Sequence, residues 1–221
     1  MTAQEWLNRR EHGAGIVELQ LGNGPSNALS APFLDALAAQ VTALDQEEAV
    51  EVILLGSPFH DFSTGTGAEQ NTADFMQALD HALIAIFACK TPIMAVVNGD
   101  IHGPGLSLIL ACDTRIGVAK SGYSFNGVET ALELSAAEIV LIKNTLESHV
   151  VRRMFLTGQT IGPVAARNYG IIDIVAEDQE DLWMYALREA KALCAISPEN
   201  YARTKTKVRA QTLETMRAAC G

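Results

Sequence analysis

Apolar and polar positions recur along the chain with the periods of strands and helices. GIVELQL (15–21) alternates and is rich in branched side chains, which predicts a strand. VEVILLG (50–56) and PIMAVVNG (92–99) are almost continuously apolar, as are strands that are buried on both faces. TRIGVA (114–119) and IIDIV (171–175) are predicted as two further strands.

Helical spacing of apolar residues fills most of the remaining chain. Leu34, Leu37, Val41 and Leu44 recur at this spacing after Ser30, a residue type that caps helix N-termini. Further helices are predicted over 73–89, from about Gly105 onward, and over 136–147, 149–157, 163–169, 178–196 and 198–219. Strands that alternate with helices predict an α/β fold with a mostly parallel sheet.

The composition is that of a folded protein and excludes several classes of partner. With 221 residues, 48% of them hydrophobic, the chain can bury a sizeable core as one domain. The net charge of −10 argues against nucleic acid, because phosphate binding needs a basic face. No stretch approaches the ~18 apolar residues of a membrane span, and residues 1–20 lack the apolar core of a signal peptide. We therefore expect a cytoplasmic protein without a nucleic-acid or membrane partner.

Cysteine spacing adds no metal or disulfide signal. The four cysteines, at 89, 112, 194 and 220, are scattered and form no CxxC pair. We interpret them as buried or reduced thiols and predict no metal site.

The most unusual stretch is NGDIHGPGLSLILACDTRI (98–116), which packs three glycines, a proline and a histidine together before an apolar run. Gly103 and Gly105 allow a sharp turn, and the N–H groups at the start of the following helix point outward. Such a turn could hold a phosphate or a developing oxyanion, although close packing alone would also select glycine. A dinucleotide site fits poorly because the GxGxxG spacing is absent, and a serine hydrolase fits poorly because GxSxG is absent.

Two glycine-rich loops follow buried strands, at 62–70 and 99–105. Ligand sites in α/β folds lie at the carboxyl ends of the strands. The sequence therefore predicts that these two loops meet at one edge of the sheet and form the site.

Taken together, four segments resemble the crotonase superfamily, the enoyl-CoA hydratases and isomerases. They are SNALS (26–30), FSTGTGAEQ (62–70), the stretch from Thr91 to Glu129, and LTGQTIGPVAARNYGIIDIV (156–175). The resemblance covers about residues 15–210. It implies a spiral of ββα turns with a second sheet almost perpendicular to the first, followed by C-terminal helices.

The same resemblance implies a domain organisation and an assembly. Residues 1–221 form a single crotonase-like domain, with a ββα core over 1–175 and a helical region over 176–221. The C-terminal helices take part in a homotrimer or hexamer. The chain stops at Gly221, where many relatives continue, so we expect a shortened C-terminal region and a more open acyl pocket.

The resemblance also implies the chemistry. Its substrate is an acyl thioester, usually on coenzyme A, and no cofactor other than this carrier is expected. Two backbone N–H groups bind the thioester oxygen and stabilise an enolate. They fall on Thr66 and on Pro104, but proline has no N–H. Either Gly103 or Gly105 supplies the second donor, or the site has one donor. Gly67 stands where the family often has aspartate.

The hydratases use two glutamates, which fall on Ser107 and Glu129. Serine cannot titrate usefully, so Glu129 is the single predicted catalytic carboxylate, unless it is an ordinary surface or salt-bridged group. One carboxylate suits proton shuttling in an isomerase better than addition of water. His102, beside the turn, is a candidate base or polar substrate contact, although a structural role is the more common one. Lys205 and Lys207 are candidate contacts for CoA phosphates or part of a solvated helix face.

Two alternatives to a CoA-dependent enzyme remain open. Some short relatives act on acyl groups held by acyl carrier protein in polyketide assembly, as dehydratases or decarboxylases. A degenerate, non-catalytic crotonase subunit is favoured by Pro104, Ser107 and the early chain end, and is opposed by Glu129.

Overall fold

The computed structural model describes residues 6–66 and 71–221, and it is built around a twisted central sheet. Within this part of the chain, six strands pair in the order β1-β2-β3-β4-β6-β8, and β5 pairs with β7 in a separate small sheet. The strands are β1 Leu7–Glu11, β2 Ile16–Leu21, β3 Val52–Gly56, β4 Ile93–Val97, β5 Ile101–His102, β6 Thr114–Val118, β7 Tyr123–Ser124 and β8 Ile174–Ala176. The strands pair in parallel, except that β1 runs antiparallel to β2.

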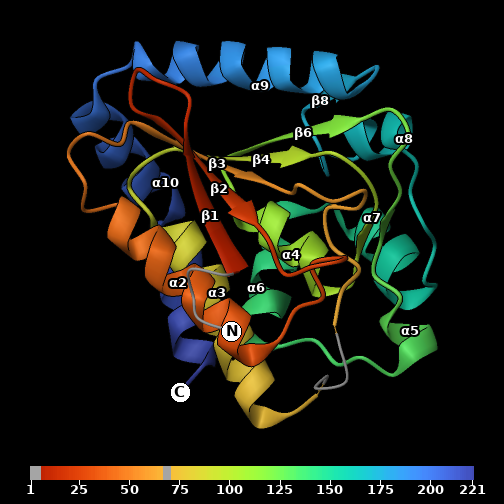
Figure 1. Cartoon of the computed structure of the whole chain (residues 1–221). Coiled ribbons are helices and arrows are strands. Elements are labelled where there is room, and N and C mark those ends of the chain that lie inside the picture. Colours follow the sequence, from red (N-terminus) through yellow and green to blue (C-terminus); the bar gives the residue numbers. More distant parts are fainter. Residues whose placement is uncertain (1–5, 67–70) are drawn as a thin grey trace.

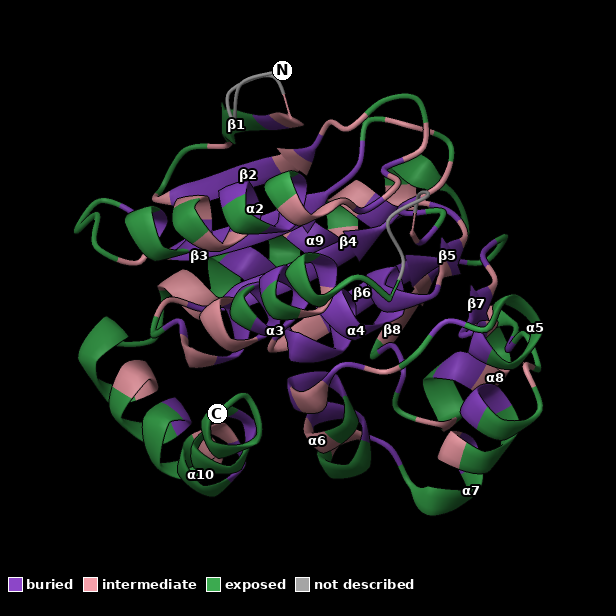
Figure 2. Ribbon diagram, turned by 90° about the horizontal axis from the view of Figure 1, so that it is seen from below, coloured by how far each residue is buried: buried purple, intermediate pink, exposed green. Residues whose placement is uncertain are grey.

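Helices cover both faces of the central sheet (Figure 1). α9 crosses one face, and α2, α3 and α4 pack on the other, where the strands lie beneath the helices as a buried layer (Figure 2). The helices are α2 Ala31–Leu44, α3 Ala73–Ala88, α4 Pro104–Ala111, α5 Gly127–Thr130, α6 Ala136–Thr145, α7 Ser148–Val151, the π-helical turn η1 Arg152–Leu156, α8 Pro163–Asn168, α9 Gln179–Cys194 and α10 Pro198–Ala219.

The continuous apolar runs are explained by this double cover. In β3, Val52 and Leu54 belong to the core layer under α9, whereas Ile53 and Leu55 belong to the larger core with α2, α3 and α4. Alternate residues of a strand point to opposite faces, so a strand between two helical layers needs apolar residues at every position. The predicted α/β fold with its mostly parallel sheet is confirmed.

Several predicted elements differ in detail. β1 was not predicted because four of the five residues of LNRRE are exposed at the sheet edge and show no apolar pattern. The last strand begins at Ile174 instead of 171, since Ile171 and Ile172 are buried in the turn after α8, where Ala166 O accepts the Ile171 N–H at 2.8 Å. The helix predicted over 149–157 is split into α7 and a π-helical turn.

A buried ion cluster attaches α10 to the core. Asp113, which follows α4, accepts hydrogen bonds from Lys205 Nζ at 2.6 Å and from the Ile93 N–H at 2.7 Å. Arg209 lies 3.0 Å from the other oxygen of Asp113 and donates to the carbonyls of Phe87 and Ala111. Lys205 is therefore a structural ion-pair partner, and the possibility that it contacts a CoA phosphate is wrong.

The loops after β3 and β4 touch at the carboxyl edge of the sheet. Asp100 O accepts the Phe62 N–H at 3.0 Å, and Ser63 O accepts the His102 N–H at 3.0 Å. A Cβ on Gly99 would stand 2.0 Å from the carbonyl oxygen of His60, which is far inside van der Waals contact. Glycine at 99 is thus a requirement of the contact between the two loops.

Replacing Gly99 by alanine should destabilise the protein and separate the two loops. Overpacking against backbone atoms costs about 1–3 kcal/mol or more, because the backbone has to shift. Urea unfolding measures the loss. The control is Gly162→Ala, where no atom lies within 4 Å of the added Cβ and the expected change is below about 1 kcal/mol. Equal stability of both variants would show that the loops tolerate separation.

Candidate functional site

The predicted site loops are brought together. The loop over 62–66 forms two parallel β-bridges. Ser63 pairs with Ile101 of β5, and Thr66, at the end of the loop, pairs with Leu29. Gly65 O accepts the Leu29 N–H at 2.7 Å. Thr66 therefore lies on the loop that is held against β5, which itself leads directly into the turn over 103–105. Gly67, also considered from the sequence, lies outside the described residues.

The turn over 103–105 begins α4. Gly103 is its N-cap, with φ of 53°, in the left-handed region that favours glycine. The Gly103 N–H donates to Ser124 O at 3.0 Å, so this group is already used within the fold. Pro104 is the first helical residue and has no N–H. Gly105 follows as the second helical residue, where an N–H has no acceptor within its own helix. Of the two donors considered, Gly105 is the one left for a ligand.

His102 is tied to the neighbouring strand. Its Nδ1 lies 2.6 Å from Ser124 Oγ, and β5 and β7 pair in register at these two residues. Asp100 Oδ1 accepts the Gly122 N–H at 2.7 Å just before β7. These contacts give the His102 ring a structural partner and fix the path of the chain toward α5.

Glu129 lies on the short helix α5, which follows β7. Its side chain is exposed, and its Oε1 is 3.5 Å from the position that a Cβ on Gly158 would take. A Cβ on Gly103 would in turn lie 3.4 Å from Leu132, two residues after α5. The fold therefore places the α5 segment beside the turn, with the Glu129 carboxylate near Gly158.

Ser107 has a carboxylate partner that the sequence analysis missed. Ser107 Oγ donates to Glu138 Oε1 at 2.5 Å, and both residues are fully buried. Burial raises the pKa of Glu138 to about 7, against the lowering effect of the hydrogen bonds from Ser107 and from the Ser135 N–H. In the sequence, the pattern Ser135-x-x-Glu138 marks a helix start, but it does not indicate that Glu138 contacts Ser107 on α4.

A cavity of about 780 Å³ opens at the carboxyl edge of the sheet. It is lined by the segment after β3, by Asn98 and Gly99 after β4, by Lys120 after β6 and by Trp183 of α9. His60 and Gly99 line this cavity and also form the close contact between the two loops. The cavity thus adjoins the loop that carries Thr66.

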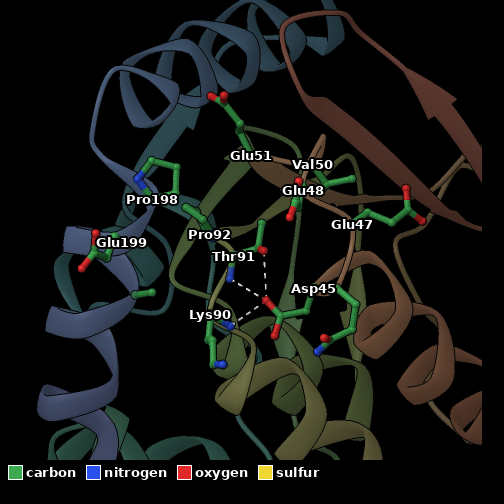
Figure 3. Close-up of a pocket in the computed structure, with 12 residues that line it drawn as sticks. Asp45, Glu47, Glu48, Val50, Glu51, Lys90, Thr91, Pro92, Pro198 and Glu199 are labelled. Atoms are coloured by element: carbon green, nitrogen blue, oxygen red, sulfur yellow. Dashed lines mark hydrogen bonds between the residues drawn. The ribbon is translucent and has the colours of Figure 1, made fainter.

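A second hollow, of about 330 Å³, lies at the opposite end of the sheet (Figure 3). Asp45 accepts hydrogen bonds there from the N–H groups of Lys90 and Thr91, at 2.9 and 2.8 Å, and from the Thr91 hydroxyl. The acidic side chains around it point in different directions (Figure 3). Asp45 joins the end of α2 to the start of β4, which is a structural role.

Across 6–66 and 71–221, no three His, Cys, Asp or Glu side chains are grouped so that they could hold a metal ion. Cys89 and Cys112 are buried, whereas Cys194 is half-buried and Cys220 is exposed. Burial raises the pKa of Cys112 to about 12, which keeps it a neutral thiol. Within the same ranges, no helix combines the length and the apolar character that crossing a membrane requires.

Comparison with known families agrees with this fold. The model of the enoyl-CoA hydratase/isomerase family matches residues 11–220. The chain belongs to this family. The resemblance to crotonases that the sequence indicated is therefore confirmed.

Individual relatives are distant. The mouse protein enoyl-CoA hydratase domain-containing protein 3, mitochondrial, is 27% identical over 93% of this chain and 71% of its own length. Rat enoyl-CoA delta isomerase 1, mitochondrial, is 24% identical over 78% of this chain and 64% of its own length. The crystal structure of an enoyl-CoA hydratase/isomerase family protein from Pseudomonas syringae superposes with a TM-score of 0.90, at 24% identity, over 99% of this chain and 96% of that one.

Replacing Glu138 by glutamine should reduce the pH dependence of stability. Because the pKa of Glu138 rises from 4.5 to about 7 on folding, the folded state binds this proton more tightly than the unfolded state. The resulting stability is fully present below about pH 4.5 and is lost as pH rises through about 7. Relative to the variant, the wild type should lose up to about 3 kcal/mol of unfolding free energy over this interval. Urea unfolding at several pH values measures the difference, and a constant difference would contradict the prediction.

Proposed function

We propose that this protein is an acyl-thioester enzyme that stabilises an enolate at the turn over 103–105 and moves a proton with Glu129. The observation that carries the proposal is the contact of the loop over 62–66 with β5, and the approach of its Gly65 to Gly103 at the start of α4, at the carboxyl edge of the sheet. This is where ligands bind in α/β folds, and a helix N-terminus favours developing negative charge. Coenzyme A enters as part of the substrate, and no separate cofactor is invoked.

The donor pair proposed here differs from the pair that the resemblance implies, which is an N–H at Thr66 and an N–H at position 104. Pro104 has none, and the N–H of Gly103 is bonded to Ser124 O. The Gly105 N–H therefore takes the second position, while Thr66 keeps the position that the resemblance assigns to the first donor. A single carboxylate at Glu129 favours double-bond isomerisation, in which one group can remove and return the proton, over addition of water.

Replacing Glu129 by glutamine should lower turnover of enoyl-CoA substrates by about 10²–10⁴, because the amide keeps the shape but cannot carry the proton. Steady-state assays with enoyl-CoA thioesters of several chain lengths, for both hydration and isomerisation, measure the loss. Glu133→Gln, an exposed glutamate in the segment after α5, is the matched control and should keep full activity. Full activity in the Glu129 variant would exclude this mechanism.

Pro104→Gly should preserve or raise turnover. Glycine restores an N–H at the first position of α4, and one donor in an oxyanion site is worth about 10²–10³ in rate. The same assays measure it, and circular dichroism checks that α4 still forms. A large loss of activity in a folded Pro104→Gly protein would show that the proline ring, and not the missing donor, matters to catalysis.

Two further measurements distinguish the CoA-dependent enzyme from the carrier-dependent enzyme and from the non-catalytic subunit. Acyl groups presented on acyl carrier protein test the carrier-dependent dehydratase or decarboxylase. Binding of acyl-CoA without turnover by any of the variants would favour the non-catalytic subunit, for which the exposed position of Glu129 is the supporting observation. Location in the cytoplasm stays a prediction from the sequence.

We also propose assembly into a homotrimer or a hexamer. Exposed apolar side chains on α5, η1 and α8, namely Val128, Leu156 and Val164, are candidates for burial between subunits. Light scattering at micromolar concentration should give a particle mass that is three or six times the chain mass of 23.7 kDa. A stable monomer would exclude this assembly.

A further inference from the structure

Ser107 stands where a side chain on α4 can reach the turn. It is the fourth residue of the helix, three after Pro104 and four after Gly103. Residues at these spacings share one face of a helix, and side chains lean back toward its N-terminus. The Ser107 side chain therefore lies on the face of α4 that continues the turn, and it is fully buried there.

Glu138 holds that hydroxyl from α6. Its Oε1 accepts from Ser107 Oγ at 2.5 Å, and its Oε2 accepts the Ser135 N–H at 3.1 Å. The Glu138 N–H in turn donates to Ser135 Oγ at 3.4 Å, which completes a capping box. Since Oε2 accepts from the helix cap, Oε1 is the oxygen of Glu138 that shares the hydrogen bond with Ser107.

The titratable side chain beside this pair is Asp80. On α3, Asp80 accepts hydrogen bonds from the Ala137 N–H at 2.9 Å and from the thiol of Cys220, which follows α10, at 3.4 Å. α4 itself contains no titratable side chain, and His149 of α7 packs edge-on against the ring of Tyr169. Asp80 is the charged neighbour of Glu138, and like burial it favours the protonated carboxyl.

The direction of the hydrogen bond depends on this proton. An ionised Glu138 is acceptor-only, so the Ser107 hydroxyl has to donate to it and turns only lone pairs elsewhere. A protonated Glu138 donates from Oε1 to Ser107 Oγ, and the serine O–H is then free to donate to another acceptor. Near neutral pH both forms are populated, because burial raises the pKa of Glu138 to about 7.

We propose that Glu138 is a positioning residue of the thioester site, acting through Ser107: while Glu138 is protonated, the Ser107 hydroxyl donates to the thioester oxygen in place of the N–H that Pro104 lacks. The inference rests on the proposed binding of acyl thioesters at this turn. It assigns the site a donor that strengthens as the pH falls through neutrality and adds no covalent step.

The test measures the hydrogen bond directly on the ligand. Butyryl-CoA labelled with ¹³C at the thioester carbonyl is bound to the wild type and to three variants, and the carbonyl stretch is followed by infrared difference spectroscopy across neutral pH. Ser107→Ala removes the donor. Glu138→Gln keeps the capping box with its amide oxygen, so its amide N–H₂ has to donate to Ser107 at every pH. Glu133→Gln, an exposed change, is the matched control.

In the wild type and in Glu133→Gln, the carbonyl band should shift to lower frequency as the pH falls, with a midpoint near the pKa of Glu138. Glu138→Gln should hold the band at the acid position throughout, and Ser107→Ala should hold it at the alkaline position. The dissociation constant should follow, with Ser107→Ala binding about 3- to 10-fold more weakly than the wild type at acid pH, the size of one ordinary hydrogen bond.

The two levels of the proposal fail differently. Bound butyryl-CoA with a pH-independent carbonyl band in the wild type, or with a band in Glu138→Gln that still titrates, overturns the role of Glu138 and leaves the proposed function standing. Failure of butyryl-CoA to bind any of the four proteins overturns both. Should Ser107→Ala not fold because it leaves Glu138 unpaired, the wild-type titration and the glutamine variant still decide the question.

Discussion

The approach of Gly99 to the carbonyl oxygen of His60 is the contact on which the site depends. It allows the loop after β3 and the loop after β4 to share hydrogen bonds, from Phe62 to Asp100 and from His102 to Ser63. These bonds continue the sheet beyond its last central residues and carry Thr66 to the start of α4. A side chain at 99 would separate the loops before either could contribute to a common site.

Pro104 changes the chemistry of this site without changing its fold. Proline fits the first helical position because its fixed φ suits the helix and its missing N–H would have had no acceptor there. The lost group is nevertheless one that a thioester oxygen would use. The neighbouring donors are unequal, since Gly103 is bonded to Ser124 and Gly105 is not required by the helix. Ser107, on the same helix as Pro104 and hydrogen-bonded to Glu138 of α6, is the residue that we propose as a replacement donor.

Several carboxylates of this acidic protein have a structural role, because they connect secondary-structure elements. Asp113 joins β4 to α10 through Lys205 and Arg209, and Asp45 joins α2 to the start of β4. Each of these half-buried carboxylates accepts from several donors, so removing one partner would leave part of its charge unpaired. Glu138 is different, because burial keeps it close to its point of titration at neutral pH.

The sequence by itself determined the fold class, because strands buried between two helical layers must be apolar at every position, as VILLG and IMAVV are. It also located the two loops, since glycine is needed where backbones touch. Only the tertiary structure decided which N–H groups were already used, that Lys205 is an ion-pair partner, and that Glu138 meets Ser107. These contacts join residues 21 to 92 positions apart, and no local pattern encodes which distant group a buried polar group will find.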